Sequence, residues 1–91
     1  MIEFDWDEEK RRKTLEERGI DFADAVRIFF GPAVRIRSDR KGELRWKLIG
    51  MLREMEVVVI YTVRGRVHRI ISARRANTDE REFYRRVMSG G

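Results

Sequence analysis

Positively charged side chains gather at the end of one apolar segment of this sequence. Residues 69–76 place two β-branched residues, then small ones, just before Arg74 and Arg75, a pattern that predicts a strand buried on at least one face. Arg64 lies in the loop before this strand, and Arg45 lies in an earlier predicted strand. A guanidinium group stays protonated and can hold two phosphate oxygens at once. The chemistry that these residues favour is therefore phosphate binding.

Groups that could move a proton are fewer, and each has a structural interpretation beside the chemical one. Glu43, beside a glycine turn, could act as a base if a poorly solvated site raised its pKa, but a surface pair with Arg45 fits equally well. His68 titrates nearest neutral pH, yet a histidine next to a hairpin loop is more often a polar strand residue. Tyr84 could donate a proton, although its helical spacing with Met88 favours core packing.

Two further residues are candidates for contact with a nucleic acid. Lys10 could reach a phosphate backbone, and Trp6 could stack on a base. The structural interpretation of Lys10 is one more solvated charge. The structural interpretation of Trp6 is the anchor of a helix over residues 7–18, whose only large aliphatic residue is Leu15.

The composition limits the compartment and the kinds of site. A chain of 91 residues is expected to form one domain, so residues 1–91 are interpreted as one unit. With no cysteine and one histidine, disulfides and thiolate metal sites are excluded and a zinc site is disfavoured. The acidic N-terminus has no apolar signal region, and the apolar runs are too short for a membrane span. These features predict a cytoplasmic protein with no membrane contact, no metal and no cofactor.

The formal charge of +5 is divided unevenly along the chain. Residues 1–34 carry 6 Lys or Arg against 9 Asp or Glu, whereas residues 35–91 carry 15 against 7. The half that supplies most of the predicted strands is therefore the basic one. A cationic field of this kind attracts polyanions, nucleic acid first, although it also keeps a protein soluble.

The hydrophobic pattern predicts a mixture of short strands and helices. Strands are expected over residues 2–6, 33–37, 44–53, 57–63 and 69–76. The first suits the edge of a sheet, and the apolar run over 57–63 suits a central strand covered on both faces. The fold class is α+β: an antiparallel β-meander of about four strands plus a short N-terminal strand, two N-terminal helices and one C-terminal helix.

Local signals mark the ends of the helices. Asp5 is expected to cap the first helix, and Gly19 to end it. Asp21 would cap the second helix and Asn77 the last. Gly50, inside a predicted strand, indicates either a bulge or the close approach of another backbone.

With these elements placed, the chain resembles the BrnT family of bacterial toxins, the ribonuclease halves of type II toxin-antitoxin pairs. The matching residues are Phe4-Asp5-Trp6-Asp7, Lys10, Gly19-Ile20, Phe22, Ala25, Gly42-Glu43, Arg45, Gly50, Val58-Val59, Thr62, Arg64, Arg69-Ile70-Ile71-Ser72-Ala73-Arg74-Arg75-Ala76, Glu80 and Tyr84. They cover almost the whole chain. Family members often have Lys-His where this chain has Glu17-Arg18, and an asparagine where it has Thr14.

The resemblance implies a RelE-like fold and metal-independent cleavage of RNA that stops translation. It also implies neutralisation by a co-expressed antitoxin of the BrnA type. That antitoxin would carry a ribbon-helix-helix DNA-binding domain, so the toxin would meet DNA only indirectly, through its partner.

Cleavage of RNA without a metal requires a base for the 2′-hydroxyl proton, cations for the charge that grows at phosphorus, and an acid for the departing 5′-oxygen. Our hypothesis is that Arg74 and Arg75, together with either Arg64 or Arg45, contact the scissile phosphate. The first two would point to opposite faces of a regular strand, so a shared role requires a bulge or the strand's end. The structural alternative is that one of them pairs with Glu80 or Glu82 and orients the last helix.

Two other classes of function fit the same residues. A non-catalytic module that binds nucleic acid or the ribosome needs only the basic strands, and it would bind RNA without turnover. A pure interaction domain would present its basic face to an acidic antitoxin and would leave RNA intact. Cleaved RNA with a 2′,3′-cyclic phosphate end distinguishes the nuclease from both.

Overall fold

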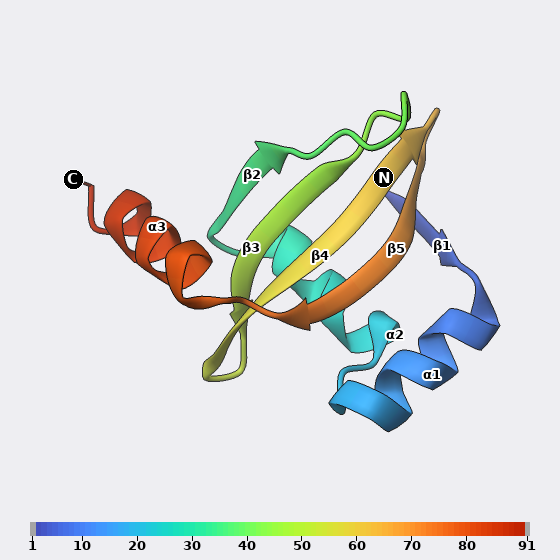
Figure 1. Ribbon diagram of the computed structural model, residues 1–91, viewed down its shortest axis with the longest axis horizontal. Helices are drawn as coiled ribbons and strands as arrows, with labels where there is room; N and C mark the ends of the chain where they lie inside the picture. Colours follow the sequence, from blue (N-terminus) through green and yellow to red (C-terminus); the bar gives the residue numbers. More distant parts are fainter. Residues whose placement is uncertain (1, 91) are drawn as a thin grey trace.

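The fold is built on a five-stranded sheet with helices on both faces (Figure 1). A computed structural model describes residues 2–90 of the chain. The elements, in chain order, are β1 (Glu3–Trp6), α1 (Glu8–Arg18), α2 (Phe22–Ala25), the 3-10 helix η1 (Val26–Phe30), β2 (Ala33–Arg37), β3 (Trp46–Leu52), β4 (Met55–Arg64), β5 (Val67–Arg75) and α3 (Thr78–Met88). The strand order is β1-β5-β4-β3-β2. The predicted α+β class and the antiparallel meander, formed by β2 to β5, are confirmed.

The N-terminal strand differs from the wholly antiparallel arrangement of the other four. β1 lies at the edge of the sheet and runs parallel to β5, with Glu3 opposite Val67 and Trp6 opposite Ile70. The sheet is therefore mixed. The sequence had predicted that Asp5 caps α1. This prediction is wrong, because β1 continues through Trp6 and Asp5 lies within the strand. The Asp5 carboxylate pairs instead with Arg69 at 3.2 Å.

The helix signals account for most of the local structure. Asp7, rather than Asp5, caps α1 and accepts hydrogen bonds from the backbone N–H groups of the two residues that follow Glu8. Gly19 ends this helix in the left-handed region, at φ 70°, as predicted. Asp21 caps α2, and η1 continues that segment up to Gly31. The second predicted helix is thus one α-helical turn followed by a 3-10 segment.

The sheet is buried on both faces at its centre. One cluster, which includes Val59 and Tyr61, packs against α2 and η1. The other, which includes Val58, packs against Tyr84 of α3 on the opposite face. Two covered faces explain why β4, the central strand, reads as one continuous apolar run.

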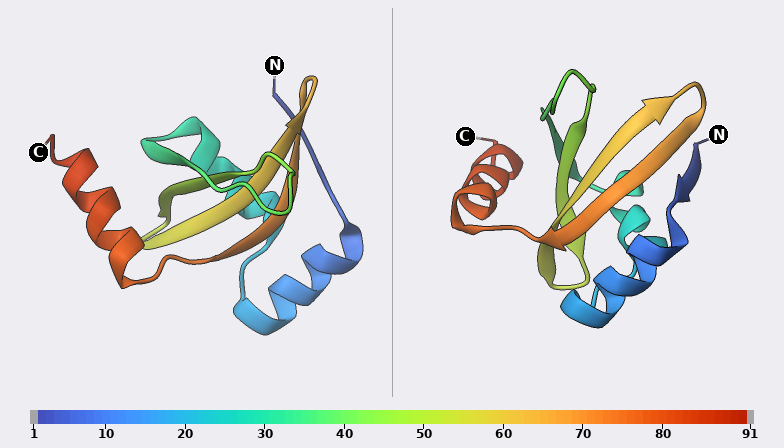
Figure 2. Two further views of the ribbon diagram at one scale, coloured as in Figure 1. Left: turned by 45° about the horizontal axis from the view of Figure 1, so that its top comes forward. Right: turned by 45° about the vertical axis from the view of Figure 1, so that its right-hand side comes forward.

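The helix α3 covers only part of its face of the sheet. It packs mainly on β2 and β3, and the two views of Figure 2 place it beyond that side of the sheet, far from β1. Among the described residues, no helix lies on the opposite side of the same face, over β4 and β5 (Figure 1). Within residues 2–90, no helix has the length and apolar character needed to cross a membrane.

Gly50 marks a close approach to a side chain, whereas the sequence had indicated either a bulge or the close approach of another backbone. A Cβ atom at this position would lie 2.9 Å from the Cβ atom of Ile28 in η1, so the contact is with a side chain and not with another backbone. Because a Cβ atom cannot rotate away, Gly50→Ala should lower the free energy of unfolding by about 1–3 kcal/mol.

Urea denaturation of Gly50→Ala measures this effect, and Gly31→Ala is the matched control. A Cβ atom at Gly31 would meet nothing within 4 Å, and its φ of −128° suits any residue. Equal midpoints for the wild type and Gly50→Ala would show that η1 can move away from the sheet without cost.

Candidate functional site

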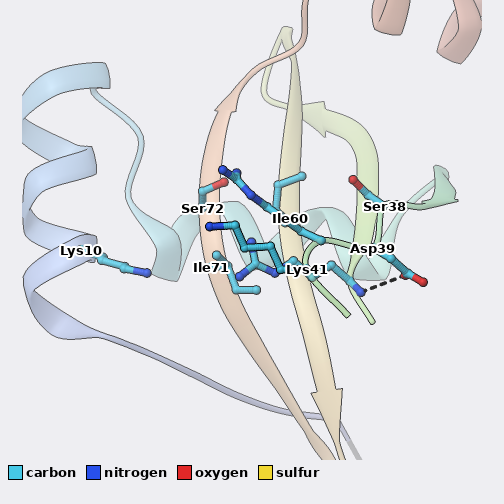
Figure 3. Close-up of a pocket in the computed structure, with 9 residues that line it drawn as sticks. Lys10, Ser38, Asp39, Lys41, Ile60, Ile71 and Ser72 are labelled. Carbon is cyan, nitrogen blue, oxygen red and sulfur yellow. Dashed lines mark hydrogen bonds between the residues drawn. The ribbon is translucent and has the colours of Figure 1, made fainter. Parts of the chain in front are cut away.

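Two adjoining cavities lie on the open part of the sheet, between α1 and the segment that connects β2 to β3, and Figure 3 shows the larger one. The larger has a volume of about 620 Å³ and is lined by Lys10, Ser38, Asp39, Arg40, Lys41, Arg45, Ile60, Ile71 and Ser72. The smaller has a volume of about 160 Å³ and is lined by Lys10, Glu43, Arg45, Thr62, Arg64, Arg69 and Ile71. Cations outnumber carboxylates in both, so each cavity favours an anion.

Separate elements supply the cations of the smaller cavity. Lys10 projects from α1, Arg45 immediately precedes β3, and Arg64 is the last residue of β4. α1 lies along β5, where the Arg18 guanidinium Nη1 donates a hydrogen bond to the backbone oxygen of Ala73 at 3.0 Å. Arg18 thus fixes the helix that carries Lys10.

A β-bulge shapes the floor that the two cavities share. Ile60 is opposite Ser72, but its neighbour Tyr61 is opposite Ile70, so Ile71 has no partner in the ladder. The bulge places the Ile71 side chain in both cavities. The floor is consequently apolar, while the walls are charged.

A tight turn and its supports hold one wall of the site. Arg40 and Glu43 exchange backbone hydrogen bonds of 3.0 and 2.9 Å around Lys41 and Gly42, whose φ angles are 50° and 79°. Two central residues with positive φ are characteristic of a type I′ turn. The Thr62 hydroxyl donates to the backbone oxygen of the residue after Glu43 at 2.8 Å and joins this wall to β4.

The carboxylate of Glu43 lies among the cations of the smaller cavity. Its Oε1 atom accepts a hydrogen bond of 2.6 Å from Arg45 Nε. That bond, together with the charges of Arg45, Arg64 and Lys10, holds the pKa of Glu43 below its ordinary value despite some desolvation. The raised pKa that would suit a base at neutral pH is therefore not present. Glu43 is ionised at neutral pH and belongs to a cationic cluster.

Arg74 faces the same side of the sheet as the cavities but is committed to another partner. Its two terminal nitrogens lie 2.7 and 2.8 Å from the two oxygens of Glu80, in α3. Lys47 Nζ lies 2.9 Å from Glu80 as well. These cations and the Asn77 backbone lower the pKa of Glu80 to about 2. This is the geometry of the structural alternative for Arg74, in which the arginine orients the last helix.

Arg75 and His68 lie on the opposite face from the cavities. Arg75 is exposed and stands opposite Val57, a residue of the cluster beneath α2 and η1. The His68 ring stacks on that of Tyr61, with centroids 5.4 Å apart, and Phe29 meets it edge-on. Burial lowers the pKa of His68, so that the ring is neutral at physiological pH. The structure therefore places Arg75 and His68 away from Lys10, Arg45 and Arg64, which line the cavities.

Tyr84 and Trp6 also have contacts of a structural kind. The Tyr84 hydroxyl donates to the backbone oxygen of Pro32 at 3.2 Å, and burial raises its pKa. The Trp6 ring meets Phe22 edge-on, and its Nε1 atom donates to Glu8 at 3.2 Å. Of the nine site residues proposed from the sequence, the cavities thus gather Lys10, Glu43, Arg45 and Arg64.

Reasoning from the sequence missed the other polar residues of the cavities. Arg69 lines the smaller one, and Arg40 and Lys41 line the larger one. The Lys41-Gly42 pair carried a usable signal, because a cation before a glycine in a two-residue hairpin turn stands at an exposed tip. Ser72 had a signal as well, because the alternation of a strand puts it on the same face as Arg74. Within residues 2–90, no three His, Asp or Glu side chains gather in a way that could hold a metal ion.

The chain is similar to known proteins over most of its length. A family model described as "Ribonuclease toxin, BrnT, of type II toxin-antitoxin system" matches residues 6–80. The structure is also similar to a crystal structure of the ribonuclease toxin BrnT of Brucella abortus, with a TM-score of 0.67 and 28% sequence identity. That match covers 86% of this chain and 100% of the other. A comparison with curated proteins gave no match.

Proposed function

Because this chain belongs to the BrnT family of ribonuclease toxins of type II toxin-antitoxin systems, we propose that it cleaves RNA at a phosphate bound in the smaller cavity, without a metal ion. The observation that carries the proposal is the convergence of Lys10, Arg45 and Arg64 on the Glu43 carboxylate. Cations placed before the reaction stabilise the charge that grows on a phosphate as its bonds change. In this protein, the side chains of Lys10, Arg45 and Arg64 supply these cations.

The roles of the residues follow from their charges. Glu43 takes the proton of the 2′-hydroxyl, whose oxygen attacks phosphorus, and the bond from phosphorus to the 5′-oxygen breaks. The Lys10 ammonium gives a proton to the departing 5′-oxygen and regains one from solvent, and Glu43 releases its proton to solvent. Arg45 and Arg64 bind the phosphate oxygens. The products are a 2′,3′-cyclic phosphate and a 5′-hydroxyl.

The low pKa of Glu43 in the free protein is compatible with this role. A bound phosphate adds negative charge beside Glu43 and competes for the guanidinium groups of Arg45 and Arg64. Both effects raise the pKa of a carboxylate. Glu43 therefore becomes a stronger base when substrate arrives, while remaining ionised before it does.

A type II toxin works with an antitoxin, and we extend the proposal to that partner. It is an antitoxin of the BrnA type with a ribbon-helix-helix DNA-binding domain, and its acidic groups cover the two cavities in the cytoplasm. The open basic face and the formal charge of +5 support an acidic contact surface. DNA would be reached only through this partner.

The purified protein should cleave single-stranded RNA in a buffer containing EDTA and leave 2′,3′-cyclic phosphate ends. Gel electrophoresis of end-labelled RNA, followed by phosphatase and kinase treatment of the ends, measures this result. Co-purified antitoxin should suppress it. Binding without turnover would contradict the nuclease and favour the alternative of a nucleic-acid-binding module, and cleavage only with an added divalent ion would contradict the metal-independent mechanism.

A further inference from the structure

The larger cavity adjoins the smaller one and shares Lys10, Arg45 and Ile71 with it. We propose that it is a second subsite, which binds the nucleotide adjacent to the scissile phosphate on one side only. This inference rests on the proposed function, since it places the scissile phosphate in the neighbouring, smaller cavity. The ligand is one nucleotide unit of single-stranded RNA: a phosphate with its ribose and base.

The size of the cavity exceeds what one phosphate needs. Its volume of about 620 Å³ lies within the usual range, about 300–1,000 Å³, of pockets that enclose whole small molecules. The smaller cavity, at about 160 Å³, falls below that range. The two therefore suit different parts of the substrate: a phosphate in one and a nucleotide in the other.

The lining of the larger cavity matches the parts of a nucleotide. Lys10 and Lys41 (Figure 3), together with Arg40, present cations to a phosphate. Ile60 and Ile71 give an apolar floor against which a ribose or base can pack. Ser38 and Ser72 add hydroxyl groups, which can bond to sugar or base in either direction.

The charge of this wall is available to a ligand. The one carboxylate in the lining, Asp39, accepts hydrogen bonds from Arg37 at 2.8 and 3.0 Å, and from the backbone N–H of Arg45 at 3.3 Å. Among residues 2–90, no carboxylate forms an ion pair with Arg40 or Lys41. Asp39 thus holds the segment in place, and the two cations of the turn face the cavity without a protein partner.

The wall is preformed, because the turn between Arg40 and Glu43 is closed by two backbone hydrogen bonds. A rigid turn loses little conformational entropy when it binds RNA. Glu43 and Lys41 belong to this same turn, so it spaces the scissile phosphate and the next nucleotide along one strand. The shared Lys10, Arg45 and Ile71 make the two cavities continuous.

The lining also determines how the nucleotide is recognised. None of the nine lining residues is aromatic, so the base cannot stack on a ring as it does in many single-strand binders. Recognition consists of phosphate contacts and packing on isoleucine. The subsite should therefore raise affinity for a longer strand more than it discriminates among bases.

The test uses the double variant Arg40→Gln, Lys41→Asn, because asparagine tolerates the left-handed backbone of position 41. For an RNA of about ten nucleotides, its KM should rise about 10-fold, as expected when two cations no longer bind phosphates. The matched control is Arg53→Asn, which removes a cation at φ 57° in the turn at the other end of β3. The increase in KM should shrink as the substrate is shortened to a dinucleotide.

A binding measurement separates this inference from the proposed cleavage. The probe is a 2′-O-methyl oligonucleotide of the same sequence, which lacks the attacking hydroxyl. The double variant should bind it more weakly, and the slope of log affinity against log salt should fall by about 0.7 for each phosphate that is no longer neutralised. Extending the RNA on one side of the scissile bond should lower KM for the wild type, and extending the other side should not.

The possible outcomes distinguish the proposed subsite from the proposed cleavage of RNA. If the wild type cleaves RNA and the double variant keeps the same KM and affinity within twofold, the subsite is wrong and the proposed function stands. If the wild type binds the probe without cleaving RNA, while the double variant binds weakly, the subsite stands and the proposed function fails. If the wild type does not bind the probe, or if Arg53→Asn weakens binding as much as the double variant does, the subsite is wrong.

Discussion

Replacing Arg64 with glutamine should lower kcat/KM for RNA cleavage by about 100-fold, the usual effect of removing one preorganised donor from a developing anion. Most of the loss should appear in kcat, because the charge on the phosphate grows in the transition state. Initial rates on a labelled RNA oligonucleotide, over a range of concentrations, separate the two constants.

Arg64 is the residue of choice because it acts on Glu43 through its charge and not through a hydrogen bond. It lines the smaller cavity at the end of β4, and among residues 2–90 it forms no ion pair with a carboxylate. Arg45, by contrast, is bonded through Nε to Glu43, so its removal would change the base as well as the phosphate contact. A substitution at exposed Arg64 should leave stability within about 0.5 kcal/mol.

The control for this prediction is Arg66→Gln in the same hairpin. Arg66 is exposed and lines neither cavity. Its removal therefore tests whether the loss of any nearby arginine lowers the rate of RNA cleavage. Activity of Arg64→Gln within threefold of the wild type would remove this residue from the mechanism. A comparable loss in both variants would indicate general electrostatic attraction of RNA in place of a specific contact.

Replacing Glu80 with glutamine should lower the free energy of unfolding by about 3 kcal/mol at neutral pH. Glu80 is 7% exposed and connects α3 to the sheet through Arg74 and Lys47. It also accepts the backbone N–H of Asn77 in a capping box. Glutamine keeps the shape but leaves Arg74 and Lys47 without a carboxylate, and a half-buried cation without its partner is costly.

The same prediction has a pH dependence of defined sign. Folding lowers the pKa of Glu80 from 4.5 to about 2, so the unfolded chain binds a proton more readily than the folded protein does. The stabilisation is therefore complete above the unfolded pKa and is lost as the pH falls through 4.5 toward 2. The difference between the wild type and Glu80→Gln should be largest at pH 7 and shrink at pH 4 and pH 3.

Urea denaturation of both proteins at several pH values measures this difference. Glu82→Gln is the matched control, because Glu82 is an exposed residue of the same helix. That variant should differ from the wild type by less than about 0.5 kcal/mol at every pH. A stability difference for Glu80→Gln that did not change between pH 7 and pH 3 would show that the ion pairs to Arg74 and Lys47 contribute little.

The two arginines with the clearest sequence signal illustrate a limit of local reasoning. Arg74 and Arg75 stand next to each other, yet they point to opposite faces of β5, as the alternation of a regular strand requires. Arg74 is bound to Glu80, six residues away in the chain, and Arg75 lies over the other face. The bulge that could have united them lies earlier in the strand, at Ile71.

Features that depend on neighbouring residues were determined by the sequence alone. Asp21, Asn77 and Gly19 mark helix ends, because caps and turns form between residues a few positions apart. The apolar run of β4 indicated its central place. The α+β class, the basic character of the strands and the family resemblance followed from the same kind of information.

The tertiary structure alone decided which charged groups meet. Lys10, Glu43 and Arg64 are far apart in the chain, and they converge because of the packing of α1 on β5, the register between β3 and β4, and the bulge at Ile71. A shift of one residue in strand register moves a side chain to the other face of a sheet. Charge interactions depend on such distances and on burial, so the composition of the site is a property of the folded chain.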